Sequence, residues 1–162
     1  MAVPGISSNL TNMHLEIDGE IESTAYPAVS KQAGGLVNGT QTDVSSVYFA
    51  DKILITISQG GRLSQWIHVP LSSASPTNME TALPGIDSDM LPLGHLTPKT
   101  LMGAGGEQRE TIGHLYASQI ASIIATRDPE ETRTVLVGLG LQKLESNRDA
   151  FFDLLELIQK VI

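Results

Sequence analysis

Residues 103–106, which read Gly-Ala-Gly-Gly, come closest in this chain to a ligand-binding motif, because a segment with helical periodicity follows at 107–126. Backbone N–H groups at the start of a helix can hold a phosphate group. However, no lysine followed by serine or threonine comes after Gly106, and Gln108 stands where the dinucleotide motif has its third glycine. We therefore favour a hinge between loop and helix here, with a nucleotide- or phosphate-binding domain as the alternative.

The other reactive residue types form no catalytic or metal-binding pattern. Asp87-Ser88-Asp89 begins like a calcium loop but lacks the glycine and the final glutamate of that motif. There is no Gly-x-Ser-x-Gly sequence, and without any cysteine the chain has no thiolate ligand, cysteine nucleophile or disulfide. The histidines are far apart, without metal-ligand spacing: His14, His68, His95 and His114. We predict that the protein is not an enzyme and has no cofactor or metal.

A tryptophan and the turn that precedes it are the candidate partner-binding residues. Trp66 faces away from Ile67 and Val69 on an expected strand. Tryptophan is enriched at binding hot spots, so this face is either a contact surface or is covered by a helix. Exposed turns also carry binding residues. The predicted partner-binding residues are Gln59, Gly60, Gly61, Arg62 and Trp66.

The strands and the turn that must position these residues are expected within residues 44–69. Ile53, Ile55 and Ile57 alternate with more polar residues, and the alternation resumes at 63–69 after the two glycines. Alternation of period two predicts strands with one buried face. Adjacent glycines supply the positive φ angles of a tight turn. We therefore expect a hairpin here and, together with the run ending at Phe49, a three-stranded meander.

The segments around this meander are less regular. Residues 1–24 are acidic, and we expect a flexible arm, with a short strand over the alternating residues 14–21 as the alternative. Residues 26–37 predict an edge strand or a loop that enters a turn. Residues 70–100 are rich in serine, threonine and proline, and they predict a long mobile insertion. Near its end, Leu91, Leu93 and Leu96 are expected to touch the body of the protein.

The C-terminal part predicts helix, strand, helix. One apolar face unites the first helix: Ile112, Leu115, Tyr116, Ile120, Ile123 and Ile124. The nearly continuous apolar run 134–141 predicts a buried strand, in which Gly138 and Gly140 let a helix approach closely. Ser146 is the expected N-cap of the last, amphipathic helix. The fold class is therefore α+β, a largely antiparallel sheet made of the central meander and a later buried strand, covered by two amphipathic helices.

Length and composition indicate one domain over residues 25–162. The 162 residues lie within the usual size of one domain, and 41% are hydrophobic, as in ordinary globular proteins. A net charge of −8 opposes binding to nucleic acid and to anionic membranes. The beginning lacks a signal-peptide pattern, and no run approaches the roughly 20 apolar residues of a membrane span. We expect a cytoplasmic protein, with the nucleus as a second location.

The chain resembles the proteasome assembly chaperone 3 family, as a divergent, fungal-type member. The residues that carry the resemblance are Ser30-Lys31-Gln32, Gly39-Thr40-Gln41, Phe49, 53–57, Gln59-x-Gly61, 63–69, Leu101-Met102-Gly103 and 135–141 with the terminal helix. The resemblance covers 29–69 and 101–162. The arm and the insertion depart from the compact family pattern.

The resemblance implies a non-enzymatic chaperone that holds alpha-type subunits while the alpha-ring of the core proteasome forms. It implies a dimer with a related small chaperone or with itself, and release when beta-type subunits arrive. A small α+β scaffold in another complex, or the phosphate-binding domain at 103–106, are the alternatives.

Overall fold

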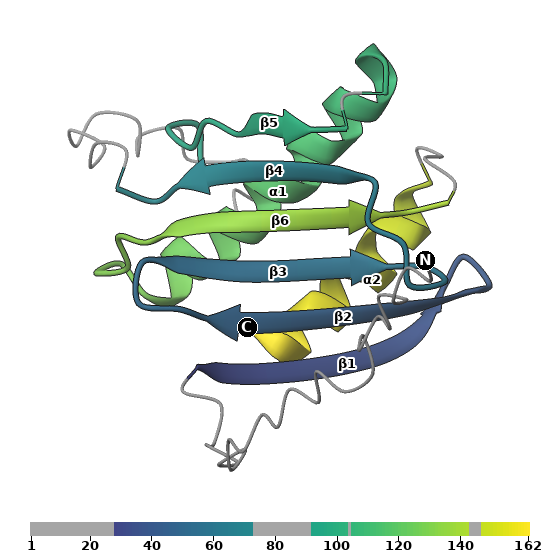
Figure 1. Cartoon of the computed structure of the whole chain (residues 1–162), viewed down its shortest axis with the longest axis horizontal. Coiled ribbons are helices and arrows are strands. Elements are labelled where there is room, and N and C mark those ends of the chain that lie inside the picture. The colour runs from purple at the N-terminus through teal and green to yellow at the C-terminus, as the bar shows by residue number, and fades with distance from the viewer. Residues whose placement is uncertain (1–27, 73–91, 104, 143–146) are drawn as a thin grey trace, which may run out of the picture.

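The computed structural model describes residues 28–72, 92–103, 105–142 and 147–162. Six strands form one sheet in the order β1-β2-β3-β6-β4-β5, and two helices lie on one face of it (Figure 1). The α+β fold class is confirmed. The elements are β1 Val29–Val37, β2 Thr40–Tyr48, β3 Lys52–Ser58, β4 Gln65–Pro70, β5 Lys99–Met102, α1 Glu107–Arg127, β6 Thr134–Gly140 and α2 Arg148–Val161.

The predicted hairpin between β3 and β4 is wrong, because β6 lies between these two strands (Figure 1). Val137 of β6 is opposite Ile55 in the parallel pairing with β3 and opposite Ile67 in the antiparallel pairing with β4. The meander consists instead of β1, β2 and β3. A strand that is apolar at nearly every position is best buried in the middle of a sheet, where neighbours cover both of its edges.

The turn itself forms as predicted. Gly60 and Gly61 have positive φ angles of 66° and 71°. Gln59 and Arg62 form an isolated antiparallel bridge across them. Beyond this bridge the two strands diverge to admit β6, so the turn reverses the chain without joining β3 to β4.

The core lies between the sheet and the two helices. Alternate residues of the central strands, such as Ile55, Ile67 and Val137, are fully buried. α1 packs mainly on β4, and α2 packs on β1 and β2. Ile120 of α1 and Ile158 of α2 are also fully buried. Burying each such side chain contributes about 1.5–3 kcal/mol, so this layer is the main source of stability.

Side chains from three other elements hold the C-terminal end of α2. Lys31 Nζ and Arg127 Nη1 donate hydrogen bonds of 3.1 Å and 2.8 Å to the main-chain oxygen of Ile162. Ser46 Oγ donates to the oxygen of Val161 at 2.5 Å. The last carbonyls of a helix have no partner within the helix, and positive charge is favourable there. These bonds connect β1, β2 and α1 to one helix end.

The helices begin near their predicted positions. The expected cap Ser146 lies outside the described residues, and the N-cap of α2 is Asn147, whose side chain accepts a hydrogen bond of 3.0 Å from the N–H of Asp149. α1 follows Gly106, which has a φ of 102° and no side chain to cap the helix. Neither described helix is long and apolar enough to cross a membrane.

The predicted insertion at 70–100 ends earlier than expected, because Lys99 and Thr100 belong to β5. Of the three leucines expected to touch the body, Leu96 is buried, Leu93 is 36% exposed and Leu91 lies outside the described residues. The arm at 1–24 and residues 73–91 of the insertion lie outside the described residues, so their mobility stays a prediction.

The chain between β3 and β4 passes directly over the end of β6. A Cβ atom on Gly140 would lie 1.5 Å from the main-chain oxygen of Arg62. Only glycine permits this approach, which is how the connection crosses the strand inserted between β3 and β4. The expectation that Gly138 and Gly140 admit a helix is therefore wrong, since Gly140 admits this crossing chain and Gly138 admits the ring of Trp66.

Gly140→Ala is expected to lower the free energy of unfolding by about 2–4 kcal/mol, because the crossing backbone must move away from the new methyl group. Urea denaturation measures this effect. Gly94→Ala is the matched control, because a Cβ atom there meets nothing within 4 Å. Equal unfolding midpoints for the two variants would contradict the close crossing.

Arg133, just before β6, links the connection between α1 and β6 to the chain that follows β2. Its guanidinium donates to Glu131 at 2.9 Å and 2.5 Å and to the main-chain oxygen of Phe49 at 2.9 Å. It also lies over the ring of Tyr48, 5.5 Å from the centroid. The hydrogen bonds from Arg133 lower the pKa of Glu131 to about 2 from an ordinary value of 4.5. The ionised form of Glu131 therefore stabilises the folded state.

Glu131→Gln is expected to reduce stability by about 2 kcal/mol at neutral pH. A carboxyl whose pKa is lowered by folding contributes above its unfolded pKa of 4.5, and that contribution is lost as the pH falls from 4.5 toward 2. The difference in urea midpoint between the variant and the unmodified protein should therefore close over this range. Glu130→Gln, at an exposed neighbouring position, is the control. A difference that is the same at pH 3 and at pH 7 would disprove the assignment.

Candidate partner-binding surface

The face of the sheet opposite the helices is only partly covered by the described residues. Its side chains alternate with the fully buried ones, and we call it the open sheet face. Val47, Leu54, Trp66, His68 and Leu136 lie on it, and each is half-buried. The registers place Leu54 between Val47 and Leu136 across three neighbouring strands. The open sheet face therefore carries a continuous apolar row.

Trp66 packs across the sheet on this face. It is opposite Gly138 of β6, and a Cβ atom on Gly138 would lie 3.0–3.1 Å from the indole ring. Met102 of the edge strand β5, opposite Trp66 on its other side, is 63% exposed. Of the two interpretations of Trp66, the structure supports the open face, since Gln65, Ile67 and Val69 point toward the helices instead.

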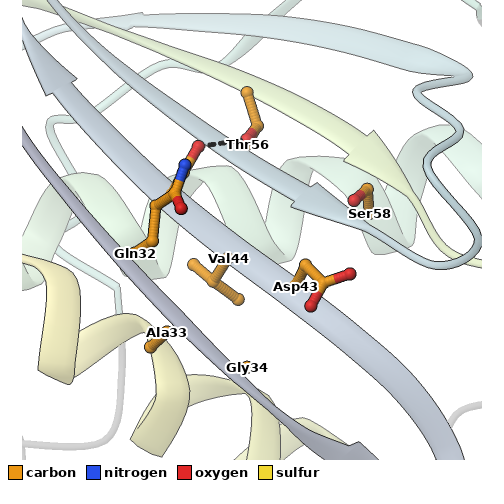
Figure 2. A pocket seen from close by; sticks show the side chains of 8 residues that line it. Gln32, Ala33, Gly34, Asp43, Val44, Thr56 and Ser58 are labelled. Carbon is orange, nitrogen blue, oxygen red and sulfur yellow. Dashed lines mark hydrogen bonds between the residues drawn. The ribbon is translucent and has the colours of Figure 1, made fainter.

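Beside this apolar row, the open sheet face over β1 and the adjoining parts of β2 and β3 is polar. Gln32, Asp43, Thr56 and Ser58 project from it around a shallow depression of about 410 Å³ (Figure 2). The hydroxyl groups of Ser45 and Thr56 are 2.6 Å apart and hydrogen-bond with each other. The depression gathers hydroxyls, one amide and one carboxylate, without a base paired to a nucleophile. Such a surface suits polar contacts around an apolar centre.

The structure separates the predicted turn residues into two kinds. Gly60, Gly61 and Arg62 are exposed, at the edge of the open sheet face where the chain crosses β6. Gln59 is 5% exposed, and its amide donates to Thr42 Oγ1 at 3.0 Å and accepts from the N–H of Gln142 at 2.9 Å. Its side chain thus holds strands together internally. The partner-binding role of the turn and of Trp66 stays a prediction.

The glycine-rich start of α1 does not make a convincing phosphate site. Glu107 and Glu110 bring two carboxylates to the first turn, where they repel an anion. The nearest guanidinium, that of Arg109, donates to Ser64 Oγ at 3.0 Å. A Cβ atom on Gly103 would lie 1.9 Å from the oxygen of Ser64, so this glycine permits close packing of two chain segments.

No group of three histidine or acidic side chains gathers to hold a metal in the described part of the chain. His114 accepts or donates a hydrogen bond of 2.9 Å with Thr100, so it connects α1 to β5. His68 lies on the open sheet face. These positions agree with histidines used for packing and surface contacts.

Sequence reasoning missed the strand β5. It also did not show that Met102 lies beside Trp66 or that Leu136 lies on the open sheet face. Pro98 and the polar residues before it concealed a strand of only four residues. Leu136 lies in a run that is apolar at nearly every position, so alternation could not show which side chains face the open side. The pair Trp66 and Gly138 could be recognised only once β4 and β6 were known to be neighbours.

Exposed apolar surface on one face of a sheet is typical of an interaction site. The family model described as "Proteasome assembly chaperone 3" matches residues 55–161, about two thirds of the chain. The chain belongs to this family of proteasome assembly chaperones. The resemblance drawn from the sequence is thereby confirmed.

A solved structure supports the same fold. The chain is similar to one in the crystal structure of a novel chaperone complex for yeast 20S proteasome assembly, with a TM-score of 0.56 and 16% identity. The match covers 81% of this chain and 96% of that one. No curated protein sequence matches significantly. At this identity the structural match shows the fold, while the family rests on the sequence match.

Gly138→Ala is expected to change the environment of Trp66, because the new methyl group would lie 3.0 Å from the ring and tilt it outward. As Trp66 is the single tryptophan, its fluorescence reports this directly. We expect stronger quenching by acrylamide with a stability loss below about 1.5 kcal/mol. Gly94→Ala again serves as control, and unchanged quenching in Gly138→Ala would contradict the observed packing.

Proposed function

We propose that this proteasome assembly chaperone pairs through its open sheet face with a related small chaperone and holds an alpha-type subunit while the alpha-ring forms. Family membership supports a role in proteasome assembly. The single observation that supports pairing is the apolar part of the open sheet face, where Trp66 of β4 and Met102 of the edge strand β5 lie side by side and partly exposed. A heterodimer is preferred, and a self-pair is the other form that this surface permits.

The open sheet face approaches the size of such a contact. Six strands about 4.8 Å apart and about seven residues long, at about 3.3 Å per residue, span roughly 24 Å by 23 Å. Two faces of this size bury a total of about 1,100 Å² or more when they meet, which approaches the roughly 1,200 Å² of a small specific interface. Aromatic anchors within a polar rim are the usual arrangement of such interfaces.

Release requires no chemistry in this chain. A chaperone that binds an early intermediate leaves when a later subunit binds the same surface more tightly, because the equilibrium then favours the complex without it. In this proposal an arriving beta-type subunit supplies that competition. We propose the cytoplasm as the location of this function, with the nucleus as a second location.

Affinity purification of the tagged protein from its native cells, followed by mass spectrometry, tests the function. We expect alpha-type subunits and a second small chaperone, without mature beta-type subunits. Recovery of neither alpha-type subunits nor a second chaperone would overturn the proposal.

Trp66→Ser is expected to weaken binding of the second chaperone at least tenfold, or about 1.4 kcal/mol, because it removes the aromatic anchor of the open sheet face. Thermal unfolding and size-exclusion chromatography of the reconstituted pair measure stability and pairing. Val29→Ser is the matched control, since Val29 is 65% exposed at the outer edge of the sheet. If Trp66→Ser pairs as well as Val29→Ser, the anchor lies elsewhere.

A further inference from the structure

A second surface lies on the opposite side of the molecule, between α1 and α2. The apolar stripe of α1 is wider than the part the sheet covers. Tyr116 and Ile120 are buried, whereas Leu115 is 44% exposed and Ile112 and Ile123 are half-buried. Phe152 of α2 is also half-buried. We call the channel between these side chains the helix groove.

Aromatic rings form the floor of the helix groove. The ring centroids of Tyr116 and Phe151 are 5.1 Å apart, and those of Phe151 and Phe152 are 5.8 Å apart. Two hollows, of about 240 Å³ and 280 Å³, share Phe151 and Phe152 as lining residues. Leu115 lines the first hollow and Ile123 the second. Leu115 and Ile123 are eight positions apart on α1, which is about 12 Å or just over two helical turns.

Gln119 places an unused hydrogen-bond acceptor in this groove. The residue is 5% exposed and lines the second hollow. Its Oε1 atom is buried and accepts no hydrogen bond from the described residues. A buried acceptor without a donor destabilises the free protein. Because the atom has almost no accessible surface, a binding partner would remove that cost by opening the groove enough to bring a donor to it.

Opposite charges stand at the two ends of the groove. Arg148 lines the first hollow, with its guanidinium 5.5 Å from the centroid of Phe152. Glu156, eight residues later on α2, lines the second hollow. Its ion pair with Lys160 is 3.1 Å long and highly exposed, so it is weak and can be exchanged. The groove is thus apolar in its middle, positive at one end and negative at the other.

We propose that the helix groove binds an amphipathic helix of the alpha-type subunit. This helix would bring two apolar side chains about seven residues apart to the two hollows and a donor to Gln119 Oε1. An acidic side chain would lie near Arg148 and a basic one near Glu156. This inference rests on the proposed function and adds the surface that holds the subunit.

The placement of the two surfaces favours this occupant. A chaperone that pairs and holds a subunit at the same time needs two surfaces that do not overlap. The helices lie behind the sheet in Figure 1, so the helix groove and the open sheet face point in opposite directions. The second chaperone on the sheet would therefore leave the groove free for the subunit.

Gln119→Leu gives the sharpest test. It removes the unpaired buried acceptor, so we expect the melting temperature of the free protein to stay the same or rise. We also expect affinity for purified alpha-type subunits, each produced singly and measured by calorimetry, to fall about fivefold or more. Weaker binding by a variant of unchanged or higher stability cannot result from unfolding. Unchanged affinity would overturn the role of Gln119.

Leu115→Glu and Trp66→Ser test the two surfaces against each other. Leu115→Glu puts a carboxylate into the first hollow, and we expect it to lose the alpha-type subunit while keeping the second chaperone. Trp66→Ser should show the opposite pattern. If the unmodified protein binds an alpha-type subunit and Leu115→Glu retains it, the groove inference fails and the function stands. If the unmodified protein binds none, the proposed function fails with it.

Discussion

β6 lies between β3 and β4 and pairs with both, parallel to one and antiparallel to the other. Since β3 and β4 are joined by a short turn, that turn must cross the end of β6, and Gly140 is the residue that leaves room for it. The same insertion sets Gly138 under Trp66. The central strand therefore determines both the path of the chain and the shape of the surface above it.

The helices cover one side of this sheet, so the two sides of the domain have different roles: one supplies stability and the other carries an apolar row that the described residues only partly cover. Lys31, Ser46 and Arg127 converge on the end of α2, so three elements of the fold hold one helix in place. The apolar layer beneath the helices accounts for stability, and it leaves the apolar row on the other side without a covering element among the described residues. A domain of this family that acts by binding needs such a surface more than it needs a pocket.

Two faces of different character suit a protein that joins others. The open sheet face is broad, with an apolar part beside a polar part. The helix groove is narrow, and its aromatic floor and unpaired acceptor suit one helix rather than a second sheet. A flat surface and a groove select different partners, which is how a small domain can take part in ordered assembly.

The sequence by itself determined the fold class, the two helices, the buried strand at 134–140 and the family. Each depends on local periodicity or on matching residues, which are present before folding. It also indicated that Trp66 faces away from Ile67, because alternation in a strand is local. Only the tertiary structure decided that β6 separates β3 from β4, since alternation fixes the face of a side chain but not the neighbouring strand. For the same reason, the burial of Gln59, the packing of Trp66 on Gly138 and the groove between the helices became visible only when distant segments met.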